Sequence, residues 1–201
     1  TFTAIGPLCQ GSTPPGLPTS STNATPITGT WDATISTASA GTITYTFTPD
    51  PGQCATSTAM DITVTPLITP TFAAIPPVCQ GATAPSLPPS STNSPAITGS
   101  WNSTVSTTSP GTTTYTFTPD AGQCAGSATI DIVVNGLPTV TASADVAICA
   151  GETTSLSASG ASSYSWSPTT DLSPTTGTPV DASPSATITY TVTGTDGNGC
   201  E

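Results

Sequence analysis

Six cysteines are the side chains of this sequence that could bond covalently to one another. They follow a regular order along the chain, at Cys9, Cys54, Cys79, Cys124, Cys149 and Cys200. None belongs to a CxxC motif and the chain has no His, so the spacing argues against a zinc site. Because each repeated segment carries two cysteines, we predict three internal disulfides, although six cysteines allow other pairings. The predicted pairs are Cys9–Cys54, Cys79–Cys124 and Cys149–Cys200.

The groups that usually carry catalysis are missing. The sequence contains no Lys, Arg or His, and its eleven acidic residues give a net charge of −11. It therefore has no usual base for a Ser nucleophile, no amine for a Schiff base and no guanidinium. No acid pair recurs with flanking aromatic residues, so we predict that the protein is not an enzyme. The lack of cations also argues against binding to nucleic acid or to anionic lipid surfaces.

One turn could hold a metal ion. Residues 196–199, with the sequence DGNG, place the oxygen atoms of Asp196 and Asn198 at alternate positions, which suits calcium. The turn lacks the further acids of a complete calcium loop and lies where a tight hairpin turn is expected. We therefore expect no cofactor, with calcium at Asp196 and Asn198 as the weaker alternative.

The cysteines are set in an internal repeat. Residues 1–70 align without gaps on residues 71–140, and 43 of the 70 positions are identical. The last segment keeps the order Cys, Trp, Tyr, Cys with different spacings. A repeat of this length, with one Trp and two Cys in each copy, indicates whole small domains rather than solenoid turns. The predicted domains are 1–68, 69–138 and 139–201.

Each repeat contains a strand with strict alternation. In Gly41–Cys54, GTITYTFTPDPGQC, the apolar residues alternate with Thr before a Pro/Asp/Gly turn, as in a half-buried β-strand. Further short strands are expected, among them Phe2–Ile5, Leu17–Ser20 and Ala55–Thr65. We therefore predict an all-β fold of tandem small immunoglobulin-like β-sandwich domains, each with one internal disulfide. The short proline-containing linkers, 66–70 and 136–138, would join them as a semi-rigid rod.

A Trp and a Tyr recur in every repeat, and a Phe accompanies them in the first two. We predict that these residues form the cores, with the tryptophans packed near the disulfides; the alternative is that the tryptophans form a platform for stacking sugars. The set is Trp31, Tyr45, Phe47, Trp101, Tyr115, Phe117, Trp166 and Tyr190.

The third domain lacks its last strand, because only Glu201 follows Cys200. A bare strand edge is something proteins avoid. Two interpretations are open: the chain is a window from a longer tandem array, or a neighbouring molecule donates the missing strand.

Cysteine usage and hydropathy predict the compartment. Six cysteines in an acidic chain rich in Thr and Pro favour an oxidising, extracellular setting. No apolar run approaches eighteen residues, so no membrane span is expected.

The repeat motifs resemble those of a known family. The pattern CQG…LPTSSTN…ITGTW…GTITYTFTPDPGQCA, present twice, is similar to repeats of very large surface proteins of gliding Bacteroidetes. The third segment, with CAGETTSLSASG…YSWSPTTDLSP…TITYTVTGTDGNGC, resembles their PKD-like modules. The resemblance implies secretion by the type IX system, a bacterial cell-surface location and a role as adhesin or surface filament, including the mobile adhesins of gliding motility.

We therefore expect a structural stalk or filament segment of a bacterial surface adhesin. The alternative is a carbohydrate-binding accessory region of a secreted polysaccharide-degrading protein. The expected partners are neighbouring repeats of the same protein, with self-assembly or a surface polysaccharide as further candidates.

Overall fold

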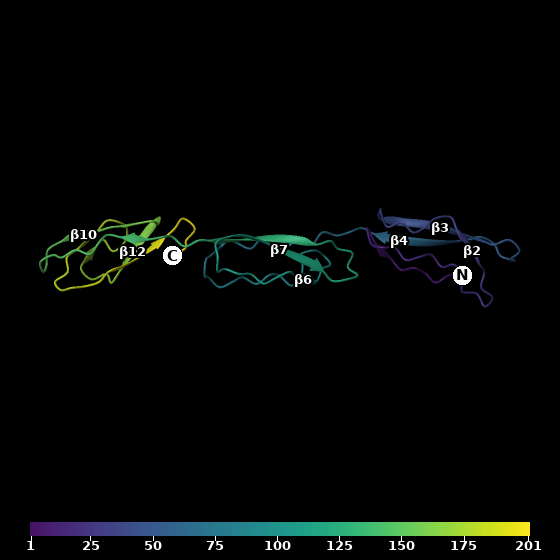
Figure 1. Ribbon diagram of the computed structural model, residues 1–201, viewed down its shortest axis with the longest axis horizontal. Coiled ribbons are helices and arrows are strands. Elements are labelled where there is room, and N and C mark those ends of the chain that lie inside the picture. The colour runs from purple at the N-terminus through teal and green to yellow at the C-terminus, as the bar shows by residue number, and fades with distance from the viewer. The chain divides into compact units, whose positions relative to one another are not determined.

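The computed structural model describes residues 1–201 and contains β-strands but no helix (Figure 1). The all-β prediction is therefore confirmed. The structure has no helix of the length and apolarity that crossing a membrane requires. The first repeat contains β1 (Leu8–Cys9), β2 (Gly29–Trp31), β3 (Gly41–Pro49) and β4 (Thr58–Thr65). The second contains β5 (Val78–Cys79), β6 (Gly99–Trp101), β7 (Gly111–Pro119) and β8 (Ala128–Asn135).

The first repeat forms one mixed four-stranded sheet in the order β1-β4-β3-β2. The hairpin of β3 and β4 is antiparallel, with Ile43 opposite Ile62 and Tyr45 opposite Met60. The short edge strand β1 runs parallel to the end of β4, which places Cys9 opposite Thr65. The second repeat has the same sheet in the order β5-β8-β7-β6.

The third segment divides its strands among smaller sheets. Its order is β10-β14-β13 in one sheet, with the pairs β11-β9 and β12-β15 beside it. Its strands are β9 (Thr141–Ala142), β10 (Thr154–Leu156), β11 (Ala158–Ser159), β12 (Ser163–Ser167), β13 (Leu172–Ser173), β14 (Val180–Ala182) and β15 (Thr191–Thr195).

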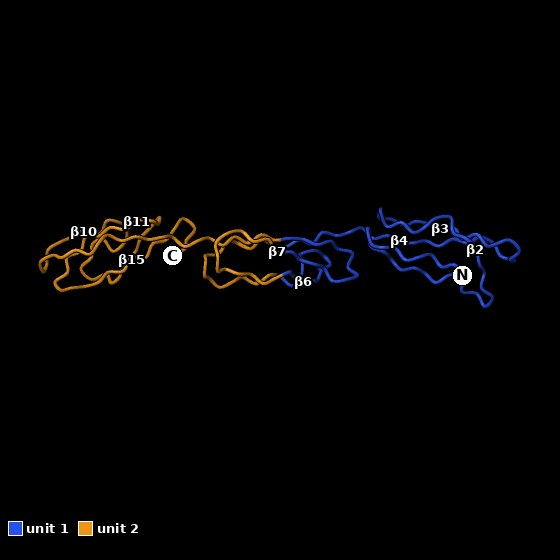
Figure 2. The backbone as a smooth tube through the Cα atoms, viewed as in Figure 1, with its two compact units in different colours: residues 1–73, 88–102, 116–129 blue, residues 74–87, 103–115, 130–201 orange.

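The chain divides into two compact units, which Figure 2 shows in different colours. Their boundary passes through the second repeat and not through either linker. The first unit is 1–73, 88–102 and 116–129; the second is 74–87, 103–115 and 130–201.

Two of the predicted strands are absent. Phe2–Ile5 is irregular, and Leu17–Ser20 contributes only an isolated bridge from Ser20 to Thr28. Pro18 removes a backbone donor from the second of these segments, and Pro14 and Pro15 do so just before it, which disfavours a regular ladder there. These irregular segments carry core side chains without forming strands.

Aromatic clusters fill the cores of the first two repeats. Phe47 is 1% exposed, and its ring lies 4.7 Å from the ring of Phe2 and 5.3 Å from that of Trp31. The second repeat has the same cluster of Phe72, Trp101 and Phe117, with centroids 4.9–5.2 Å apart. Among the residues predicted for the core, those that lie buried are Tyr45, Phe47, Tyr115, Phe117 and Trp166, and those that lie half-buried are Trp31, Trp101 and Tyr190.

Gly29 allows β2 to approach β3 closely. A Cβ at this position would overlap the carbonyl oxygen of Thr48 and lie 2.6 Å from the Phe47 ring. Because one of these contacts is backbone, Gly29→Ala is expected to lower the free energy of unfolding by about 2–3 kcal/mol. Chemical denaturation of the variant measures this loss. Gly6→Ala, which meets open space, is the control, and equal midpoints for the two variants would contradict the prediction.

Candidate functional site: the inter-repeat disulfides

The structure contains two disulfides, and each joins consecutive repeats. Cys9 bonds to Cys124 with a Cα–Cα distance of 5.0 Å, and Cys79 bonds to Cys200 at 5.5 Å. Both distances fall in the ordinary range for disulfides. Cys54 and Cys149 are exposed free thiols. The prediction of one internal disulfide in each domain is therefore wrong for all three pairs, Cys9–Cys54, Cys79–Cys124 and Cys149–Cys200.

The sheet explains why Cys9 and Cys54 cannot meet. Cys9 lies opposite Thr65, at the last residue of β4, whereas Cys54 lies in the turn before β4 begins at Thr58. The length of β4 separates them by about 23 Å. A disulfide needs Cα atoms about 4.4–6.8 Å apart, so an internal bond is excluded.

The second repeat repeats this arrangement. Cys79 pairs with Asn135 at the end of β8, and Cys124 precedes the start of β8 at Ala128. In each repeat one cysteine therefore lies where the chain leaves the domain and the other lies at the opposite end of the hairpin. A bond between the exit cysteine and the turn cysteine of the next repeat follows from this geometry.

Backbone pairing accompanies the first bridge. Ile68, in the linker, pairs in parallel with Ala125, next to the bonded Cys124. The N–H of Ile68 donates to the Cys124 carbonyl at 2.8 Å, and the N–H of Gly126 donates to the Ile68 carbonyl at 2.9 Å. The whole joint lies inside the first compact unit. The linker and the disulfide therefore connect the first two repeats at neighbouring positions, since Ile68 pairs with the residue next to Cys124.

One turn presents all three exit cysteines. The carbonyls of Cys9, Cys79 and Cys149 each accept a hydrogen bond from the N–H three residues later, at 3.1, 3.1 and 3.0 Å. The glycine two residues after each cysteine has a φ of 77°, 78° and 82° respectively, which suits the third position of a type II turn. The free Cys149 therefore occupies the same local structure as the two bonded exit cysteines.

The turn cysteines Cys54 and Cys124 are also held alike. The side chain of Gln53 accepts from the N–H of Thr28, and that of Gln123 accepts from the N–H of Thr98, at 3.1 and 2.9 Å. The two threonine hydroxyls donate to Asp50 and Asp120, both at 2.6 Å. Cys54 is therefore presented on a turn braced like that of the bonded Cys124.

Asp196 braces the turn that carries Cys200. Its carboxylate accepts the N–H of Asn198 at 2.8 Å and that of Cys200 at 2.9 Å. These hydrogen bonds, that from Cys200 foremost, hold the pKa of the Asp196 carboxyl below its ordinary value. The Asp196 carboxylate proposed for calcium thus binds the backbone of its own turn, and the structure contains no group of three or more His, Cys, Asp or Glu side chains placed to hold a metal ion.

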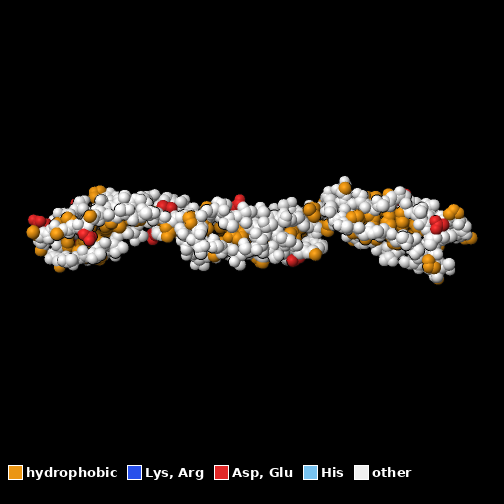
Figure 3. Space-filling model, in the orientation of Figure 1, with side chains coloured by type: hydrophobic (Ala, Val, Ile, Leu, Met, Phe, Trp, Pro, Cys, Tyr) orange, Lys and Arg blue, Asp and Glu red, His pale blue; other side chains and the backbone are white.

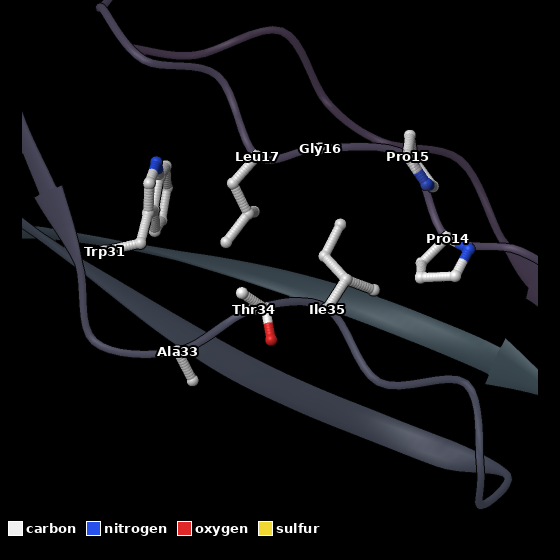
Figure 4. A pocket seen from close by; sticks show the side chains of 8 residues that line it. All are labelled: Pro14, Pro15, Gly16, Leu17, Trp31, Ala33, Thr34 and Ile35. Atoms are coloured by element: carbon white, nitrogen blue, oxygen red, sulfur yellow. The ribbon is translucent and has the colours of Figure 1, made fainter.

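Trp31 lies near the start of β4, at the opposite end of that strand from the bonded Cys9. Trp31 pairs with Phe47 on β3 and donates its indole N–H to the carbonyl of Pro18 at 2.7 Å. It borders a hollow of about 540 Å³, toward which Leu17 and Ile35 point from opposite sides (Figure 4). The hollow is lined by Pro14, Pro15, Gly16, Leu17, Trp31, Ala33, Thr34 and Ile35. Thr34 is the one residue among them with a free side-chain hydroxyl, so the hollow is mainly apolar.

The visible surface carries scattered carboxylates and no cationic side chain (Figure 3). The chain matches no protein-family model and no curated protein sequence. The two disulfides between repeats are therefore the features of the chain that bear most directly on its function.

Proposed function

We propose that this chain is a structural segment of a bacterial surface adhesin, in which disulfides lock consecutive β-domains together. The observation that carries the proposal is the pair of bonds Cys9–Cys124 and Cys79–Cys200, since each spans a joint between repeats. Proteins that only bind a small ligand have no need for such bonds at every joint. A stalk or filament does, because its joints bear load.

The domain architecture, the route of secretion and the location of the chain are further parts of this proposal. The aromatic cluster under each four-stranded sheet supports an immunoglobulin-like architecture for the first two repeats. The motif resemblance supports a PKD-like third domain, secretion by the type IX system, a place on the cell surface and a part in gliding motility. The disulfides themselves indicate an oxidising, extracytoplasmic environment.

The two free thiols, Cys54 and Cys149, are the groups through which we expect further repeats to be joined. Cys149 lies in the exit turn and Cys54 in the hairpin turn, so one matches the bonded Cys9 and the other the bonded Cys124. We therefore expect Cys149 to bond to the turn cysteine of a following repeat. In an isolated preparation, Cys54 of a second copy provides that cysteine.

Oxidation with a small disulfide such as oxidised glutathione tests this pairing. One thiolate displaces a glutathione thiolate to form a mixed disulfide, and the second thiolate displaces the other glutathione. The wild-type chain is expected to form a ladder of covalent oligomers on a non-reducing gel. The head-to-tail contact can repeat, so growth does not close at a dimer.

Two single variants provide matched controls. Cys54→Ser keeps Cys149, and Cys149→Ser keeps Cys54, so an equimolar mixture should give a covalent dimer that neither variant gives alone. Equal dimer yields from each variant by itself would show that the thiols pair without head-to-tail specificity and would contradict the proposal.

The second candidate, a carbohydrate-binding accessory region, rests on the hollow beside Trp31. An exposed aromatic ring can stack on a sugar, but the ring of Trp31 packs against Phe2 and Phe47 and its N–H is already bonded. Polysaccharide binding that is lost on Trp31→Ala and kept on Trp166→Phe would favour this candidate over the structural one.

A further inference from the structure

The third domain contains an open groove of about 700 Å³. Two segments supply most of its lining, residues 142–148 with Ala150 and residues 184–190. Leu156, Trp166 and Ala182, which belong to the core of this domain or pack against it, also line the groove. The groove therefore opens onto the hydrophobic core, where a protein normally places a covering element.

A pentapeptide that occurs twice in the chain allows this part of the third domain to be compared with the first repeat. The sequence TITYT occurs at Thr42–Thr46 and again at Thr187–Thr191. The first copy lies within β3 and pairs with β4. The second copy is irregular until Thr191, where β15 begins and pairs with β12. Since the sequences are the same, the difference lies in the neighbouring strand and not in intrinsic propensity.

The position of the groove matches that of β4. In the first repeat β4 lies between β1 and β3. The corresponding segments of the third domain are Ile148–Cys149, which has the exit turn that follows β1, and Thr187–Tyr190. Ile148 and Thr187–Tyr190 both line the groove, and their counterparts in the first repeat are the two neighbours of β4, so the groove corresponds to the place of a β4 strand.

We propose that this groove binds a β-strand of the β4 and β8 type, antiparallel to Thr187–Tyr190 and parallel to Ile148–Cys149. The inward residues of β8, Ile132 and Val134, are 1% and 4% exposed, and a strand with this alternation would place the same side chains over Leu156 and Trp166. In the first repeat Ile43 of β3 lies opposite Ile62 of β4. The same register would place Ile188 opposite the isoleucine of the added strand that corresponds to Ile62 and Ile132.

The occupant is an unpaired strand of the β4 and β8 sequence type and not a folded second copy. β4 is already paired on both edges, with β1 and β3, and β8 lies likewise between β5 and β7. Neither can leave its sheet without unfolding its own repeat. By contrast, the backbone of residues 185–189 makes no hydrogen bond to another backbone segment, so its donors and acceptors are available to an added strand. The inference rests on the repeat architecture and is independent of the proposed function.

A peptide with the sequence of Ala125–Asn135, AGSATIDIVVN, tests the proposal on the intact chain. We expect saturable binding by calorimetry and slower amide exchange at Thr187–Tyr190 in the complex. The same peptide with Ile132→Asp should bind at least about tenfold more weakly, because its central side chain would carry a charge into the core.

Matched protein variants locate the binding site. Ile188→Asp should abolish binding, whereas Val133→Asp, at an exposed position of β8 outside the groove, should leave it unchanged. Equal binding of the two peptides, or no binding of either, would overturn the proposal, and this outcome does not depend on whether the protein variants fold. Dimerisation without peptide that Ile188→Asp abolishes would assign the groove to a second copy and would also overturn it.

Discussion

Cyanogen bromide cleavage of the oxidised chain is expected to cut the backbone and yet leave one covalent molecule. The reagent cleaves after methionine, and the sequence contains a single Met, at position 60. The cut separates residues 1–60 from residues 61–201. Cys9 lies in the first fragment and its partner Cys124 lies in the second, so the disulfide holds the two together until a reductant is added.

The experiment separates the two possible pairings on one gel. An internal bond between Cys9 and Cys54 would lie wholly inside residues 1–60 and would release that fragment without reduction. Cleavage is carried out in acid, where disulfide exchange is suppressed because it proceeds through thiolates. Met60→Leu, which cannot be cut, serves as the control for non-specific breakage.

The hairpins were accessible from the sequence, but the pairing of the cysteines was not. Alternation of Ile43, Tyr45 and Phe47 with threonine predicts β3, and the structure buries Tyr45 and Phe47 on its inner face. The parallel contact of β1 with the end of β4 involves two residues in each strand, which is too short to leave a periodic pattern. That contact decides where Cys9 lies, so its partner could not be inferred.

Other parts of the candidate site were visible in the sequence without being recognised. The glycine two residues after Cys9, Cys79 and Cys149 marks the shared exit turn, and the DxGQC sequence marks the turn of Cys54 and Cys124. The position of Cys54 in a turn, beyond the end of its strand, was the signal that it faces away from its own repeat. The missing last strand of the third domain was expected from the sequence, but the irregular course of Thr187–Tyr190 beside the groove was not, because TITYT reads as a strand in both places.

The disulfides change which parts of the chain would carry load. A tension applied through the bridges passes from Cys9 to Cys124, along the second repeat to Cys79, and on to Cys200. Both linkers, 66–70 and 136–138, lie outside this covalent path. The proline-containing linkers would therefore be protected from extension, and cutting one of them would not part the chain. This consequence follows from the covalent connectivity alone.

Removal of the first bridge is expected to cause a large loss of stability. The bond joins residues 115 apart in sequence. In the chain-entropy model, opening a loop of that size costs about 5 kcal/mol of unfolding free energy. Small domains are stable by roughly 5–15 kcal/mol, so the double variant Cys9→Ser with Cys124→Ser should unfold at a much lower denaturant concentration. Unfolding followed by tryptophan fluorescence at equal protein concentration measures the shift.

The matched control is Cys54→Ser with Cys149→Ser, which removes the same two sulfur atoms from exposed sites without breaking a bond. Surface substitutions of this kind change stability by about 0.5 kcal/mol or less, so the two double variants should differ by several kcal/mol. Internal pairing makes a different prediction, because each double variant would then break two bonds and lose a similar amount of stability. Repeating the unfolding measurement with a reductant gives a second comparison of the same variants. It should bring the wild type and the Cys54/Cys149 variant down to the stability of a chain without disulfides, while the Cys9/Cys124 variant falls only by the contribution of Cys79–Cys200.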